Sequence, residues 1–507
     1  MPTTSVSPTP TPTPTPTSTP ARSASPGHAA VLALMCACVA VVMSMVAAVN
    51  LAVPQMSAGS LHPSASQLLW VVDAYTVAFA GLLIPAGAFG DRHGRKGALM
   101  AGLAVFAAGC LLRAAAPALP VLIAGRLLAG AGAALVMPAT MSVLLHVVPK
   151  QKRQAAVATW TASTAVAGLL GNIGGAAVVQ YLPWQALFWV YVPLALALIA
   201  AVGAITPRTA TSPANLDPVG SLLLLAGFVA LLFGIIEGPA LGWSSTGVLC
   251  GYGAAVVLLA IFIRYELRVE HPLLDPRLFR LPSLLSGTLG IVATFFGMFA
   301  LFFVNAQFLQ YVKAYSPLQS GVSALPLAVT MAVVSRLSPR AVRRLGARAA
   351  TVTGMAVIAC GLVLLSFADA RTPYTLYALW LVLMGCGVGL AGPALSLSVV
   401  SALPSHRAGA GAGLNSASRE MGAALGVAVV GSVLTSRFTG HLPPPLAGAR
   451  STADALTQAA HLSGTVHQQT VAAFAHAVAD GYRTAAGIVL LVAILIAMLS
   501  GHRDEAP

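Results

Sequence analysis

Charged residues are scarce in this sequence. Asp, Glu, Lys and Arg make up 8% of its 507 residues, 57% are hydrophobic, and the mean hydropathy is +0.85. Soluble domains carry about 25% charged residues, so this composition excludes a soluble fold. The apolar runs are also too long, and alternate too little, for the strands of a membrane β-barrel. The sequence therefore predicts an all-α polytopic membrane protein.

Other absences exclude whole classes of chemistry. The six cysteines lie in apolar runs, without the spacing of a disulfide or zinc framework, and read as small buried hydrophobic residues. His461, His467 and His476 lack metal-ligand spacing, so no metal site is expected. No phosphate-binding Gly-x-x-x-x-Gly-Lys-Ser/Thr loop occurs, and hence no ATP cofactor is expected. An enzyme would need His, Asp or Ser clustered at one membrane face, and a sensor a soluble signalling domain; the sequence has neither.

The net charge of +14 does not point to nucleic acid, because most of the 27 lysines and arginines fall in loops and ends on one side of the expected bundle. That distribution follows the positive-inside rule and marks this side as cytoplasmic. The expected surroundings are a lipid bilayer, the plasma membrane of a bacterium, with no nucleic-acid partner and no obligate protein partner.

We expect about fourteen spanning segments of roughly 20 residues each. Because this number is even, both termini are expected to be cytoplasmic. Residues 1–28 form a Thr- and Pro-rich tail of extended, polyproline character, and residues 501–507 form a short second tail. The segments centre near Val41, Ala78, Phe106, Ala133, Ala167, Ala195, Ala226, Val256, Phe296, Val329, Ile358, Gly387, Ala424 and Leu490.

One short charged loop organises the chain. It runs from Gly87 through Asp91, Arg92, Gly94, Arg95 and Lys96, between two long apolar runs, so the flanking helices must be antiparallel neighbours. The cations alone fit an ordinary positive-inside loop. The whole pattern, Gly-x-x-x-Asp-Arg-x-Gly-Arg-Lys, resembles the loop between helices two and three of the major facilitator superfamily. In that reading Asp91 and the arginines form a conformational latch, a charge-assisted network that locks and releases helices.

Further strings resemble the fourteen-helix drug:proton antiporter branch of that superfamily. They are Trp70-Val-Val-Asp73-Ala-Tyr75, Glu237-Gly238, Ser316-Pro317-Leu-Gln-Ser-Gly321 and the region from Asn415 to Gly422. The resemblance implies two six-helix halves, 29–205 and 271–500, with helices seven and eight inserted over 206–270 and a long outer loop over 437–481. A weakened copy of the charged loop, Arg340 to Arg348, supports this duplication, since repeated halves place a transporter site at the midplane.

Ionisable residues inside apolar segments are costly, so each is a functional candidate. Arg126, followed by small residues, corresponds to an arginine associated with proton coupling in the family; the alternative is a side chain that snorkels to the outer surface. Asp73 begins helix two, where it titrates or meets a cationic substrate, or is simply hydrated at the outer rim. Arg113 is expected to snorkel outward.

Arg419 and Glu420 lie inside the thirteenth expected helix, where adjacent side chains point about 100° apart and need not pair with each other. Burial favours the neutral form of a glutamate, as a proton carrier requires, and the alternative is a structural ion pair with another helix. Glu237, near the outer end of the inserted pair, is a weaker candidate for proton coupling.

The fifth helix carries Gly168, Gly171, Asn172 and Gly175, where the resemblance places the antiporter motif that shapes the central cavity. Asn172 stands in place of the family proline, and close packing of helices through small residues is the alternative explanation. A second departure lies in the first helix, where Met45 replaces a usual acidic residue.

The resemblance implies proton-coupled efflux of small hydrophobic compounds, as in drug or antibiotic export, by alternating access and with no cofactor other than the proton gradient. The alternative within transport is a proton-coupled carrier of a metabolite such as a sugar, amino acid or siderophore.

Overall fold

The computed structural model describes residues 27–58, 61, 63–149, 152–207, 217–270, 272, 275–402, 408–446, 448–449, 452–462 and 464–499. Within these ranges some helical side chains, that of Asp91 among them, lie outside the description. Most of the expected tail 1–28 and all of the tail 501–507 also lie outside it. The described residues form α- and 3₁₀-helices and no strand, which confirms the all-α membrane class.

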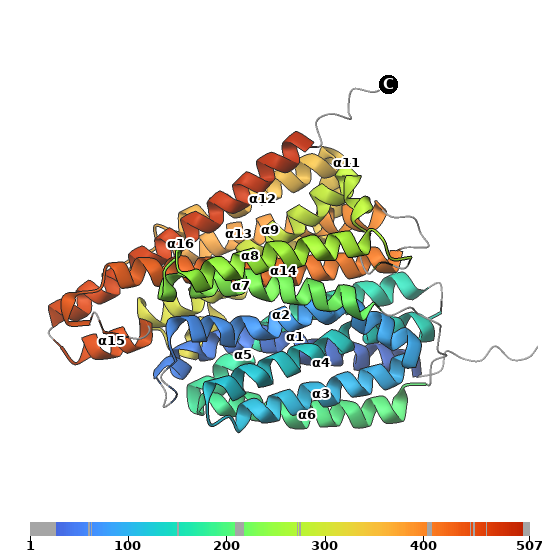
Figure 1. The fold of residues 1–507 in the computed structure, drawn as a ribbon, viewed down its shortest axis with the longest axis horizontal. Helices are drawn as coiled ribbons and strands as arrows, with labels where there is room; N and C mark the ends of the chain where they lie inside the picture. The colour runs from blue at the N-terminus through green and yellow to red at the C-terminus, as the bar shows by residue number, and fades with distance from the viewer. Residues whose placement is uncertain are drawn as a thin grey trace, which may run out of the picture.

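The elements follow one another along the chain as antiparallel helices (Figure 1). They are α1 (Gly27–Ala58), α2 (Ala65–His93), α3 (Arg95–Ala114), α4 (Leu119–Val147), α5 (Arg153–Tyr181), α6 (Trp184–Ile205), α7 (Pro218–Leu241), α8 (Thr246–Glu266), η2 (Pro276–Arg280), α9 (Pro282–Tyr311), α10 (Pro317–Val322), α11 (Leu325–Leu345), α12 (Ala347–Leu365), α13 (Tyr374–Ser401), α14 (Ala408–Gly440), η4 (Pro444–Leu446), α15 (Thr452–Ala460) and α16 (Gly464–Leu499).

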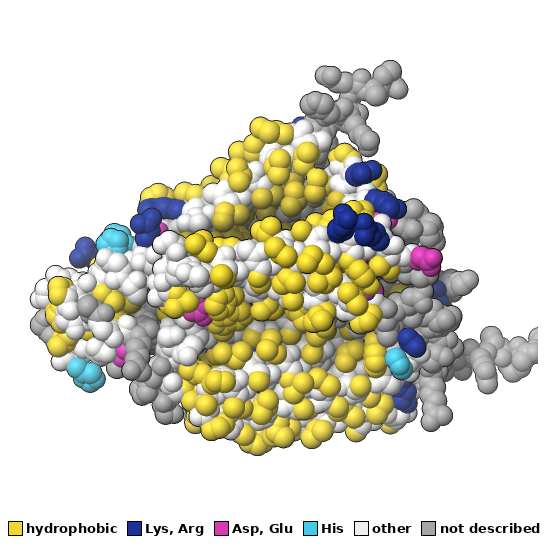
Figure 2. All heavy atoms as spheres, viewed as in Figure 1, with side chains coloured by type: hydrophobic (Ala, Val, Ile, Leu, Met, Phe, Trp, Pro, Cys, Tyr) yellow, Lys and Arg dark blue, Asp and Glu magenta, His cyan; other side chains and the backbone are white. Residues whose placement is uncertain are grey.

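Thirteen helices among the described residues are long and apolar enough to cross a membrane. The remaining long helix, α5, spans 29 residues, and its apolar part is Val166–Tyr181. A broad apolar surface covers the middle of the molecule, with lysine and arginine gathered near its ends (Figure 2). We call the end that carries Arg92, Arg95 and Lys96 the cation-rich end, and the other the opposite end.

The packing is duplicated. In the first half α1 packs on α5, α2 on α4, and α3 on both α4 and α6. In the second half α9 packs on α14, α11 on α13, and α12 on both α13 and α16. Each helix of one half therefore has a counterpart in the other, with the same neighbours. The inserted helices α7 and α8 break this symmetry: α7 packs on α2 and on α14, and α8 packs mainly on α7 along the face between the halves (Figure 1).

Two expectations change in detail. The outer segment 437–481 is largely helical: α14 continues to Gly440 and α16 already begins at Gly464, so its polar first turns precede its apolar stretch. The cysteines are not uniformly buried, because Cys250 and Cys360 are exposed on the outside of the bundle. Lipid-facing positions accept a small apolar thiol as readily as the core does.

Both halves make their second-to-third helix connection with a single glycine. Gly94 joins α2 to α3 with φ 94°, and Gly346 joins α11 to α12 with φ 83°. These positive φ values disfavour any residue with a Cβ atom. The shared geometry agrees with the repeat expected from the charged loop and its weakened copy.

We predict that Gly346→Ala lowers the free energy of unfolding by about 1 kcal/mol, because alanine is strained at positive φ. A Cβ at Gly346 meets no atom within 4 Å, so backbone strain is the only cost. Gly253→Ala in α8 is the matched control, since it also has open space but no positive φ. Thermal unfolding in detergent should separate the two variants; equal melting temperatures would contradict the prediction.

Candidate functional site

Arg126 of α4 is fully buried and grips the backbone of α2. Its Nε donates to the Val71 carbonyl oxygen (2.6 Å) and one terminal nitrogen donates to the Val72 carbonyl oxygen (2.5 Å). Its guanidinium carbon lies 5.0 Å from the centre of the Tyr75 ring. The other terminal nitrogen has no hydrogen-bond partner among the described residues. The snorkelling alternative is therefore excluded, since the side chain reaches no surface.

Asp73 follows these two carbonyl groups on α2 and is also fully buried. Neither of its carboxylate oxygens has a hydrogen-bond partner among the described residues. Its electrostatic neighbour is Arg126. A buried carboxylate without hydrogen bonds is costly, and such groups concentrate at functional sites. The alternative of a hydrated residue at the rim is wrong, because the outer turns of α2 pack inside the bundle.

Tyr75 connects this pair to α1 and to the second half. Its hydroxyl donates to the Val42 carbonyl oxygen of α1 (2.8 Å), and its ring is fully buried. It interacts electrostatically with Glu420, which is half-buried on α14, packed against α2. Asp73, Tyr75 and Arg126 thus lie together in the first half, and Glu420 lies on the helix of the second half that packs against α2. We call these four residues the Tyr75 cluster.

Arg419 of α14 packs on an aromatic ring of the second half. Its guanidinium carbon lies 4.5 Å from the centre of the Phe295 ring on α9, and its Nε has no hydrogen-bond partner among the described residues. Arg419 and Glu420 nevertheless interact electrostatically with each other, although the 100° step between adjacent helical residues points their side chains in different directions.

The sequence-based prediction for Arg113 of α3, a side chain that snorkels outward, is wrong. It is fully buried, not snorkelling: its Nε donates to the Gly109 carbonyl oxygen (3.0 Å) and a terminal nitrogen to Cys110 Sγ (2.9 Å). Its guanidinium carbon lies 4.5 Å from the Phe188 ring centre. The missed signal is Gly125 of α4, where a Cβ would lie 2.7 Å from Arg113 Cγ. The glycine makes the room that the arginine stem occupies.

Glu237 joins α7 to α2. Trp70 Nε1 donates to Glu237 Oε1 (3.1 Å), and beside it Ser432 Oγ of α14 donates to the Ile235 carbonyl oxygen (2.7 Å). The inserted helix α7 is thereby bonded to both halves at the same level near the opposite end. Among the described residues, Glu237 forms no hydrogen bond with a member of the Tyr75 cluster.

At the cation-rich end, the hydrogen bonds described for the predicted latch residues join helices of the first half. Arg95 donates to the Ser142 carbonyl oxygen of α4 (3.3 Å), and Lys96 Nζ donates to the Gly203 and Thr206 carbonyl oxygens at the end of α6 (2.8 and 2.7 Å). Cations stabilise helix C-termini, where carbonyl groups lack partners. Arg92 is exposed, and the side chain of Asp91 lies outside the description.

The weakened copy of the loop repeats this contact. Arg348 stands two residues after Gly346, as Lys96 stands two residues after Gly94, and it donates to the Ala497 carbonyl oxygen near the end of α16. In each half, therefore, a cation that begins the third helix binds the C-terminal carbonyl groups of the sixth.

Comparison with known families and proteins decides the family. The model of the Major Facilitator Superfamily matches residues 34–427. The chain belongs to the major facilitator superfamily. Multidrug resistance protein Stp of Mycobacterium tuberculosis is 30% identical over 474 residues, which cover 90% of this chain and 88% of Stp. The tetracenomycin C resistance and export protein of Streptomyces glaucescens is 30% identical over 471 residues, with coverage of 90% and 87%.

A solved structure shows the same fold at low identity. A bacterial homologue of the human lysosomal transporter Spinster matches with a TM-score of 0.68 and 14% identity, over 94% of this chain and 98% of that one. The expected major facilitator fold is thus confirmed, as is the expectation of relatives among multidrug and antibiotic exporters.

The candidate residues of α5 lie on two faces of that helix: Gly171 and Gly175 face α1, whereas Gly168 faces open space. A Cβ on Gly171 would collide with the Ser44 carbonyl oxygen of α1, and one on Gly175 would lie 2.7 Å from the Ala48 Cβ. Gly168 meets nothing within 4 Å. Asn172 donates to the Gly168 carbonyl oxygen (3.1 Å), and α5 runs through it unbroken. Gly171 and Gly175 are packing residues, as the close-packing alternative holds.

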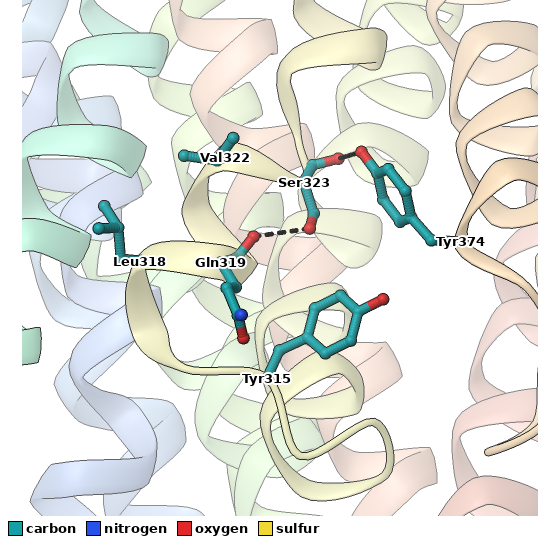
Figure 3. Close-up of a pocket in the computed structure, with 6 residues that line it drawn as sticks. All are labelled: Tyr315, Leu318, Gln319, Val322, Ser323 and Tyr374. Atoms are coloured by element: carbon teal, nitrogen blue, oxygen red, sulfur yellow. Dashed lines mark hydrogen bonds between the residues drawn. The ribbon is translucent and has the colours of Figure 1, made fainter.

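A pocket of about 450 Å³ opens at the opposite end (Figure 3). The tyrosines 315 and 374 face it from different segments, and Tyr374 donates to the Ser323 carbonyl oxygen (3.4 Å). Among its lining residues there is no Asp, Glu, His, Lys or Arg. Its lining residues are Tyr315, Leu318, Gln319, Val322, Ser323 and Tyr374.

We predict that Gly171→Ala lowers the free energy of unfolding by about 1–3 kcal/mol, because the added methyl group forces α5 away from α1. Gly168→Ala is the matched control: it lies one turn earlier on the same helix and faces open space. Thermal unfolding in detergent measures both. If Gly168→Ala were the more damaging change, the assignment of the α1-facing surface would be wrong.

Proposed function

We propose that the protein exports small, largely apolar compounds in exchange for protons. The observation that carries the proposal is Asp73, a carboxylate buried without a hydrogen-bond partner beside Arg126 in a major facilitator chain. The names of the relatives, which are multidrug and antibiotic resistance proteins, support export as the direction. The gradient itself is the energy source, with no cofactor, and the partners are substrate, protons and lipid.

The proposed topology places the cation-rich end in the cytoplasm of a bacterial cell, by the positive-inside rule. With α5 as the fourteenth spanning helix, both termini lie on that side. The helices α1–α6 then form the first half, α7 and α8 the inserted pair, and α9–α16 the second half, close to the boundaries 29–205, 206–270 and 271–500 expected from the sequence.

Alternating access would open and close the two ends in turn. Near the opposite end the halves meet through weak contacts: Gln310 donates to the Leu51 carbonyl oxygen (3.5 Å) and the Leu318 amide donates to Gln180 Oε1 (3.5 Å). Gly321 packs on the Asn172 backbone. Long hydrogen bonds and small-residue contacts of this kind separate at little cost, so they suit a gate that must part in each cycle.

In this proposal the Tyr75 cluster binds and releases the transported protons. When Asp73 carries a proton, Arg126 keeps its two hydrogen bonds to the α2 carbonyl oxygens; when Asp73 is ionised, Arg126 is the cation that acts on it. Glu420 brings the second carboxylate from the other half. We place Arg419 outside proton transfer because it faces Phe295, and Glu237 in the anchoring of α7 because it bonds to Trp70.

Inside-out vesicles with an imposed pH gradient test the proposal, with hydrophobic antibiotics and dyes as substrates. We predict gradient-driven accumulation by the wild type and at least about a hundredfold slower accumulation by Glu420→Gln or Asp73→Asn, since a missing proton carrier costs about that much. Asp369→Asn is the control. Asp369 is an exposed outer-loop acid, and the bond that its Oδ1 accepts from the Thr372 hydroxyl (2.7 Å) holds the pKa of that carboxyl below its usual value.

Three results would contradict parts of the proposal. Unchanged accumulation in both variants would remove the Tyr75 cluster from coupling. Accumulation without any gradient would indicate a facilitator. Gradient-driven uptake of sugars or amino acids, with no response to hydrophobic compounds, would favour the metabolite carrier.

A further inference from the structure

Four arginines share one side of α11 near its C-terminal end, which lies at the cation-rich end of the bundle. They are Arg336, Arg340, Arg343 and Arg344, and all four side chains are exposed. Successive residues of a helix are about 100° apart, so the positions i, i+4, i+7 and i+8 fall within a sector of about 100°. We call these four residues the arginine face. It extends over about 12 Å of the helix.

The same side of α11 is apolar nearer the middle of the membrane. Val329, Val333 and Leu337 are exposed, and their spacing places them in line with the arginine face. Ser338 lies on the other side of the helix, where it is buried and its Oγ donates to the Leu390 carbonyl oxygen of α13 (3.0 Å). The side of α11 that packs on α13 is therefore opposite to the side that carries the apolar residues and the arginines.

The arginine face has no acidic partner among the described residues. None of its four side chains forms a hydrogen bond or an ion pair there. The helices that pack against α11, which are α13, α12 and α5, contain no Asp or Glu. The other group of exposed arginines at this end, in the connection from α8 to α9, alternates with Glu266, Glu270 and Asp275. A counter-charge for the arginine face must therefore come from outside the described residues.

The inserted helices leave this side of α11 open. The first-half counterpart of α11 is α2, which packs on α7 as well as on α4 and α14. Among the described residues, α7 and α8 do not pack on α11 in the same way. The positive-inside rule explains why cations lie at this end, but it does not require them to share one open side of one helix, without acids and in line with apolar residues.

We propose that the arginine face binds the head groups of anionic phospholipids. The apolar residues in line with it contact the acyl chains, and the arginines lie at the level of the phosphates. Arginine suits this role because its planar fork donates two hydrogen bonds to phosphate oxygens at once. A cluster of arginines beside the end of a spanning helix is the arrangement that attracts anionic lipids. Lipid binding goes beyond the proposed export function and does not depend on it.

Native mass spectrometry of the purified full-length protein tests the proposal, because it resolves single bound lipids. The protein is titrated in detergent with phosphatidylglycerol, an anion, and with phosphatidylcholine of the same acyl chains, which has no net charge. We expect the Kd of the first phosphatidylglycerol to be at least about fivefold lower, which is the effect of one arginine near a charged surface. A higher salt concentration should reduce this ratio, since salt screens exposed charges. Equal Kd values for the two lipids would overturn the proposal.

A triple variant locates the bound lipid. Arg336→Gln/Arg340→Gln/Arg344→Gln removes most of the arginine face and should bring the two Kd values to within about twofold of each other. If this variant fails to fold, Arg340→Glu places one acid within the face and should lower the ratio in the same direction. A ratio that stays at the wild-type value in the folded variant would place the lipid elsewhere and contradict the proposal.

The matched control removes the same charge at the same end of the molecule. Arg264→Gln/Arg268→Gln/Arg280→Gln changes exposed arginines that lie among acids, so the preference for phosphatidylglycerol should remain. An equal loss of preference in this control would mean that the lipid responds to the total positive charge and not to the arginine face.

Asp504 and Glu505, which lie outside the described residues, are the other source of negative charge to test. The double variant Asp504→Asn/Glu505→Gln should keep the wild-type ratio of the two Kd values. A preference for phosphatidylglycerol that appears only in this double variant would show that the acids of the chain itself occupy the arginine face, and the proposal would be wrong.

Discussion

The grip of Arg126 on the α2 backbone is the interaction on which the rest of the site depends. In a low-dielectric interior a guanidinium group needs acceptors, and the Val71 and Val72 carbonyl oxygens provide them. This contact fixes α4 against α2 and places the Tyr75 ring beside the charge. One terminal nitrogen of Arg126 and both carboxylate oxygens of Asp73 remain without hydrogen-bond partners among the described residues. The contact thus stabilises the helix pair and still leaves a buried donor and a buried acceptor unpaired.

The duplicated halves repeat a detail that composition alone does not reveal. A glycine with positive φ turns the chain between the second and third helices, and the cation two residues later, Lys96 or Arg348, binds the end of the sixth helix. The turn and the helix terminus are chemically coupled, because the terminus exposes carbonyl groups and the turn supplies the cation. In this way each half closes this end with a contact between two of its own helices.

Most of the fold could be predicted from the sequence, because spanning helices are long apolar runs and the charged loop is specific to a family. Local pattern also identified Arg126, Asp73 and Glu420, since a charge in a membrane helix is rare. It failed for Arg113, whose direction depends on Gly125 of a neighbouring helix. It failed for the start of α16 as well, where a polar sequence is helical beyond its apolar stretch. Both failures concern tertiary neighbours that a linear pattern does not contain.

The position of α7 and α8 has a consequence for how a lipid-soluble compound reaches the protein. Two seams run between the halves, one along α2 and α14, the other along α5, α10 and α11. The inserted pair covers the first and is bonded to both of its sides through Glu237 and Ile235. Among the described residues, a compound dissolved in the bilayer therefore finds the inserted pair over the seam of α2 and α14 and not over that of α5, α10 and α11. The chain is two-fold symmetric inside and one-sided toward the lipid.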